Sequence, residues 1–168
     1  MESIANMRLG AWYLGNERCE FFVWAPFSKE VKLNMVFPQK RIIHMEPWED
    51  GYWYLLADDI YPGTQYLYKL DKLVDRPDLA SHFQPEGVHG PSEVVDHRSF
   101  IWTDNNWQGL PLNEMIIYEL HVGTFSPEGT FDGIIQRLNY FKELGINAIE
   151  IMPVAQFPGE RNWGYDGT

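Results

Sequence analysis

Short apolar runs separated by turn-forming residues fill the first hundred positions of the chain. One of them, 31–37, alternates apolar and polar side chains, and Asp59 and Pro62 stand in the breaks between runs. A period of two places alternate side chains on opposite faces of a strand. The sequence therefore predicts an all-β sandwich of the immunoglobulin-like kind, with strands at 21–26, 31–37, 51–56 and 65–70.

The pattern changes after residue 114. Residues 115–122 form a nearly continuous apolar run, which is typical of a strand buried on both faces of a parallel sheet. Thr130 is a good helix N-cap and Gly145 a good C-terminal stop. Between them apolar residues recur every three or four positions and predict one helix with a single apolar stripe, made of Phe131, Ile134, Ile135, Leu138, Phe141 and Leu144.

A second apolar run, 146–152, follows this helix and ends at Pro153. Strand, helix and strand in this order predict a parallel pair joined by a right-handed crossover, the repeating unit of a (β/α)8 TIM barrel. Since a full barrel needs about 250 residues, we expect a truncated barrel. The predicted division is a β-sandwich module at 1–104, a linker at 105–114 and the first β/α/β unit at 115–168.

Composition narrows the function classes. A net charge of -11 argues against nucleic-acid binding, which needs clustered Lys and Arg. No apolar run approaches the length of a membrane span, and no secretory signal is visible, so we expect a cytoplasmic protein. The single cysteine, Cys19, excludes an intrachain disulfide and a thiolate metal cluster. We expect neither a cofactor nor a metal.

Long motifs carry a family resemblance. The early segments resemble the starch-binding-type modules that precede branching and debranching enzymes. The later ones resemble malto-oligosyltrehalose trehalohydrolases, a family of α-amylase-superfamily glycoside hydrolases. The segments concerned are 22–26, 31–33, 51–53, 63–68, 76–81, 84–96, 116–131, 150–159 and 162–167.

The resemblance implies a reaction. Such enzymes hydrolyse the α-1,4 bond next to a terminal trehalose and release trehalose from malto-oligosyltrehalose, with retention at the anomeric carbon. Retention requires two carboxyl groups about 5–5.5 Å apart. In this family they follow the third barrel strand, which places them beyond Thr168. The expected partner is therefore an α-glucan, but this chain is expected to hold no catalytic residue and to be inactive alone.

The resemblance also names candidate substrate-binding residues after the second barrel strand: Tyr165, Asp166 and Trp163. Barrel active sites assemble at this rim, where a tyrosine ring stacks on the sugar and the aspartate binds hydroxyl groups. His121, Glu119 and Glu150 are interpreted as structural support, with Glu150 buried in its strand. The aromatic residues interpreted as sandwich core rather than as sugar platforms are Trp24, Trp53, Tyr66 and Tyr68.

Two other functions stay open. A glycogen-branching-type transferase shares the module and the first barrel strand, although branching relatives usually have Gln at the position of Asp166. A non-catalytic carbohydrate-binding module is the alternative outside enzymes. The apolar strands 115–122 and 146–152 are of the kind that is covered on both faces and paired on both edges. The sequence therefore predicts that the chain either self-associates through 115–168 or leaves that stretch poorly ordered while the sandwich stays folded.

Overall fold

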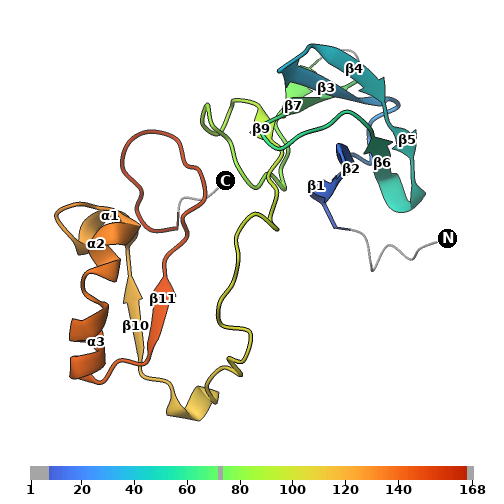
Figure 1. Cartoon of the computed structure of the whole chain (residues 1–168). Helices are drawn as coiled ribbons and strands as arrows, with labels where there is room; N and C mark the ends of the chain where they lie inside the picture. The colour runs from blue at the N-terminus through green and yellow to red at the C-terminus, as the bar shows by residue number, and fades with distance from the viewer. Residues whose placement is uncertain (1–7, 72–73, 166–168) are drawn as a thin grey trace. The chain divides into compact units, whose positions relative to one another are not determined.

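The computed structural model describes residues 8–71 and 74–165, and its contacts divide the chain into two units, 1–101 and 102–168. Figure 1 shows mainly strands in the first unit, and helices with a strand pair in the second; a 3₁₀ turn at Glu49–Gly51 also belongs to the first unit. The predicted boundary at residue 104 lies near this division and stays a prediction.

The first unit is built from two antiparallel sheets. One has the order β1 (Gly10–Gly15), β2 (Arg18–Trp24), β6 (Tyr52–Ala57) and β5 (Glu46–Pro47). The other has the order β4 (Arg41–His44), β3 (Val31–Phe37), β7 (Gln65–Leu70) and β8 (Val74–Arg76), with β9 (Ser92–Glu93) also paired to β7. The predicted sandwich is confirmed.

Alternate side chains of these strands form one core between the sheets. Phe21 of β2 meets Tyr66 of β7 edge to face, with ring centroids 5.0 Å apart. This contact joins the two sheets and is favourable beyond the area it buries. The buried members of the core include Cys19, Phe21, Val23, Val31, Leu33, Met35, Trp53, Tyr66 and Tyr68.

The core interpretation is wrong for Trp24. It is the last residue of β2 and is 54% exposed, because it falls on the row that points away from the core. Its indole Nε1 donates a hydrogen bond to the backbone oxygen of Asp50. For Trp53, Tyr66 and Tyr68 the interpretation is confirmed, since all three are buried.

Asp78, in the loop after β8, brings a buried carboxylate to the tyrosines of the second sheet. Asp78 is only 4% exposed. Its Oδ2 accepts hydrogen bonds from the hydroxyls of Tyr66 and Tyr68, at 2.8 and 3.2 Å, and its Oδ1 accepts one from the backbone N–H of Ala80. The backbone N–H of Asp78 donates to the hydroxyl of Ser92 on β9. Buried polar groups need such partners, and these tie the loop after β8 to the sandwich.

The second unit contains the predicted parallel pair, β10 (Ile117–Leu120) and β11 (Ala148–Ile151). Its helices are α1 (Val122–Phe125), α2 (Phe131–Ile135) and α3 (Leu138–Leu144), and a 3₁₀ turn at Leu112–Glu114 precedes β10. Sandwich and barrel-like unit together match the expected fold class.

Two local predictions in this unit are wrong. The first strand ends at Leu120, before Val122, because the carbonyl of His121 accepts the N–H groups of Thr124 and Phe125 and opens a helical turn. The single predicted helix is broken at residues 136–137, where the N–H of Arg137 bonds to the carbonyl of Ile134 in a tighter turn.

The predicted helix ends are confirmed. The Thr130 hydroxyl accepts the N–H of Gly133, and Gly145 ends α3 in the left-handed region with φ +89°. Phe141 packs against Tyr118 and Phe125 on the helix side of the strands. Of the predicted apolar stripe, Ile134 and Phe141 are buried, whereas the other four residues are exposed: Phe131, Ile135, Leu138 and Leu144.

Candidate functional site

The segment after β11 folds back over the carboxyl ends of both strands of the second unit (Figure 1). The ring Nε2 of His121, directly after β10, lies 3.1 Å from the backbone oxygen of Asn162. Gly164 has φ +108°, and a Cβ there would lie 2.9 Å from the sulfur of Met152, directly after β11. The left-handed backbone of Gly164 favours glycine, and its close approach leaves little room beside the Met152 sulfur. The segment is thus held against both strand ends.

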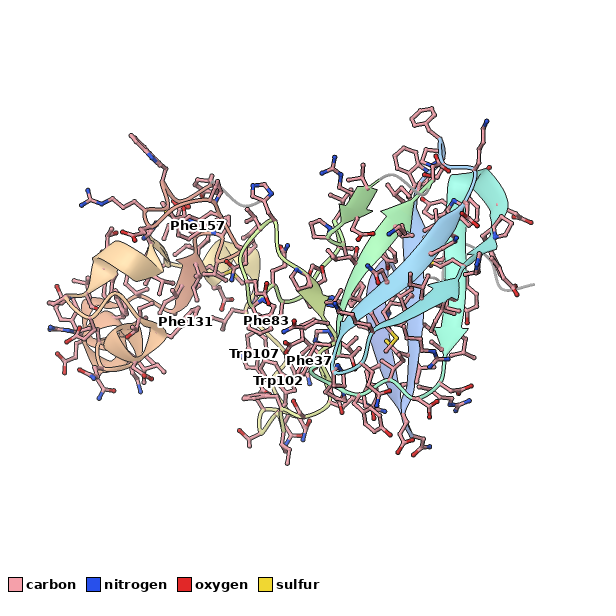
Figure 2. All side chains as sticks on the ribbon, turned by 90° about the horizontal axis from the view of Figure 1, so that it is seen from above. Phe37, Phe83, Trp102, Trp107, Phe131 and Phe157 are labelled. Atoms are coloured by element: carbon pink, nitrogen blue, oxygen red, sulfur yellow. The ribbon has the colours of Figure 1, made fainter. Side chains whose placement is uncertain are left out.

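A cavity of about 600 Å³ lies between this segment, α1 and the turn before α2. Its apolar walls include Phe131 and Phe157, which are labelled in Figure 2. Glu160, Arg161 and Asn162 supply polar groups from the returning segment. A largely apolar cavity with a few polar groups is the usual form of a small-ligand site.

Two carboxylates lie side by side on β10 and β11, near the carboxyl ends of these strands, which form the rim of the second unit. Glu119 of β10 and Glu150 of β11 are register partners. Since Tyr118 and Leu120 pack on the helix side, and alternate side chains point to opposite faces, both carboxylates lie on the face away from the helices. Both residues are exposed, which corrects the prediction that Glu150 is buried. Their environment is open to solvent.

Tyr165 reaches this face from the returning segment. Its hydroxyl donates a hydrogen bond to Oε1 of Glu119. The pKa of Tyr165 is raised above its ordinary value, first because Glu119 accepts this hydrogen bond, and further by burial and by the negative charges of Glu119 and Glu150. Because the phenol stays protonated at neutral pH, it remains a donor to the carboxylate.

The three residues predicted to bind substrate have different outcomes. Tyr165 and Trp163 lie in the returning segment and are 67% and 90% exposed. Their exposure leaves both rings open to a ligand. Asp166 lies outside the described residues. Whether any of them binds a sugar stays a prediction.

Sequence reasoning missed the pairing of Tyr165 with Glu119. It assigned Glu119 to structural support because no third convergent group was visible. The two residues are 46 positions apart, but the signal was present: parallel strands carry their carboxyl ends to the same edge, where barrel sites form.

No group of three or more His, Cys, Asp or Glu side chains suited to a metal ion occurs within 8–71 and 74–165. Within the same ranges the structure holds no helix with the length and apolar character that crossing a membrane requires.

Comparisons with known proteins give a separate family match for each of the two units. Residues 8–78 match carbohydrate-binding module 48, the isoamylase N-terminal domain, and residues 95–168 match the alpha-amylase catalytic domain. The first unit is therefore similar to a carbohydrate-binding module of that type, and the second is similar to part of an α-amylase catalytic domain.

Individual relatives indicate a narrower family than the two domain matches do. The chain is 47% identical over 155 residues to the malto-oligosyltrehalose trehalohydrolase of Saccharolobus solfataricus, covering 92% of this chain and 27% of that relative. A crystal structure of an assumed alpha-amylase from Salmonella typhimurium superposes with a TM-score of 0.84 at 42% identity, over 95% of this chain and 27% of that one. The predicted resemblance to the trehalohydrolases is confirmed.

The alternative family is more distant. The 1,4-alpha-glucan branching enzyme GlgB of Bacillus caldolyticus is 27% identical over 172 residues, which cover 88% of this chain and 25% of the enzyme. This chain thus spans about a quarter of the length of the curated relatives that it matches.

Proposed function

We propose that this chain forms part of a retaining α-glucan hydrolase that releases trehalose from malto-oligosyltrehalose. The observation that carries the proposal is the 47% identity with a trehalohydrolase over 92% of this chain. The carboxylates that break the bond are proposed to lie outside residues 1–168, since the chain corresponds to only 27% of that relative. Water, the cosubstrate, completes the hydrolysis.

In this proposal the rim above β10 and β11 receives a glucose unit next to the bond that is cleaved. The ring of Tyr165 stacks on the apolar C–H face of the sugar, since a flat aromatic ring suits that face. Trp163 offers a second ring, and Asp166 accepts hydrogen bonds from hydroxyl groups. The exposure of Tyr165 and Trp163 supports this role, because a platform must be open to its ligand.

The first test concerns the chain by itself. Purified chain incubated with malto-oligosyltrehalose is expected to release no trehalose above a buffer control, because the two catalytic carboxylates are proposed to lie outside residues 1–168. Trehalose would be measured by chromatography. Release at a rate that scales with the chain concentration would show that the reaction uses residues within 1–168 and would refute the proposed placement of the catalytic groups.

A hybrid enzyme tests the function itself. The region of the Saccharolobus solfataricus trehalohydrolase that aligns with this chain is replaced by this chain, and the products of malto-oligosyltrehalose and of amylose are analysed. Trehalose release is expected. New α-1,6 branches in amylose without trehalose would favour the branching-type transferase. Retention of the hybrid on an amylose gel, with neither product, would favour a binding module only.

We also propose that the whole protein acts in the cytoplasm. A separate proposal concerns this chain alone, which is expected to self-associate through residues 115–168. Ile117, Tyr118 and Ile151 on the strand pair are exposed, and edge strands are templates for another chain. Light scattering is expected to give a mass above that of one chain, and Ile117→Lys is expected to lower it. A monomer at every concentration tested would contradict self-association.

A further inference from the structure

The Tyr165 side chain is presented from a segment whose backbone is held at two neighbouring points. Asn162 is tied through its backbone oxygen to the ring of His121, and its Oδ1 accepts the N–H of Gly164. Gly164 in turn lies against Met152. These contacts fix where the tyrosine backbone stands, but an exposed ring on a fixed backbone still rotates about two side-chain bonds.

A hydrogen bond fixes that rotation. The Tyr165 hydroxyl donates to Oε1 of Glu119, which stands on a regular strand, in register with β11. A bond to an ionised carboxylate is stronger than one between neutral groups. A ring that is already oriented loses less conformational entropy when a ligand binds. The carboxylate thus acts on the ring without needing to touch a ligand.

We propose that Glu119 is a positioning residue, which holds the Tyr165 ring in the orientation that receives a glucan. This inference rests on the proposed sugar-binding role of Tyr165 and adds a second residue to that site. Glu150, the register partner of Glu119, faces the same side, and it acts on the phenol through its negative charge.

The direct readout is the ionisation of one phenol. The chain carries nine tyrosines, so it is labelled with ¹³C at the tyrosine ring carbon bearing the hydroxyl, and the Tyr165 signal is assigned by its loss in Tyr165→Phe. Glu119→Gln is expected to lower the pKa of Tyr165 toward its ordinary value, because the accepting carboxylate is gone. Glu150→Gln, the matched control, removes one charge at the same level and is expected to lower that pKa less.

The second readout is the response of the same signal to maltoheptaose, which reports binding at this site rather than at the sandwich. For Tyr165→Phe, Glu119→Gln and the double variant, binding is followed through the indole signal of Trp163 in a chain labelled at its tryptophan rings. Each is expected to weaken binding roughly threefold to tenfold, the range for one hydrogen bond, and the double variant is expected to be no weaker than either single variant. Glu150→Gln should stay within about twofold of the parent chain.

The outcomes separate the two ideas. If Tyr165→Ala leaves maltoheptaose binding unchanged, the sugar-binding role of Tyr165 is wrong and the positioning role falls with it. If Tyr165→Ala weakens binding but Glu119→Gln changes neither the pKa of Tyr165 nor the affinity, only the inference about Glu119 is overturned. Additive losses in the double variant would likewise overturn it, since they would mean that the two groups act separately.

Discussion

Replacing Asp78 by alanine is expected to lower the free energy of unfolding of the sandwich by roughly 3 to 5 kcal/mol, because two buried hydroxyls and one partly buried N–H lose their acceptor. Those donors are the hydroxyls of Tyr66 and Tyr68 and the N–H of Ala80. Both tyrosines are buried in the core, so their hydroxyls are out of contact with bulk water when the carboxylate is removed. Urea unfolding followed by tryptophan fluorescence measures the change.

Asp75 provides the matched control. It is an exposed aspartate on β8 that pairs with Lys69 and accepts a hydrogen bond from Asn34. Asp75→Ala is expected to cost less than about 1 kcal/mol, as exposed pairs do. Equal losses at the two positions would show that the Asp78 network adds nothing to stability beyond an ordinary surface pair.

The carboxyl group of Asp78 also makes the stability of the sandwich depend on pH. Burial raises the pKa of Asp78 above its ordinary value, although its hydrogen bonds oppose the shift. Because the folded-state pKa is raised, the contribution of this group to stability is full below its unfolded pKa and falls as pH rises through its folded pKa. The effect of Asp78→Asn should therefore become less unfavourable as pH rises through that window.

The regular parts of both units could be predicted because local patterns decide them. Period-two alternation at 31–37 matches β3, and the stop at Gly145 matches the left-handed end of α3. Such features depend on residues that are neighbours in the sequence. The sandwich and the parallel pair can be predicted because each of their strands and helices carries such a local pattern.

The errors arise where a distant partner decides. The row that Trp24 occupies cannot be known until the register of β2 against β6 is fixed, since one step of register moves every side chain to the other face. The bond between Tyr165 and Glu119 joins residues 46 positions apart, with α1, α2, α3 and β11 between them in the chain. No local periodicity encodes that contact; the topology does.

The hybrid enzyme proposed above gives the largest expected functional effect. In it, Tyr165→Ala is expected to lower kcat/KM for trehalose release by about a hundredfold, because a small misplacement of the sugar at the cleaved bond costs that much in rate. Tyr165 is the ring that the returning segment brings to Glu119 at the strand ends. Trp163→Ala is expected to have a smaller effect, since in the proposal Trp163 offers only a second ring beside that of Tyr165.

Tyr140→Ala is the control for this experiment. Tyr140 is also an exposed tyrosine of the second unit, but it stands on α3, where its ring contacts Phe141. Initial rates with malto-oligosyltrehalose give kcat/KM for each variant, and thermal melting checks that each stays folded. If Tyr140→Ala and Tyr165→Ala lower kcat/KM equally, the loss comes from general destabilisation, and the rim above β10 and β11 is not where the sugar binds.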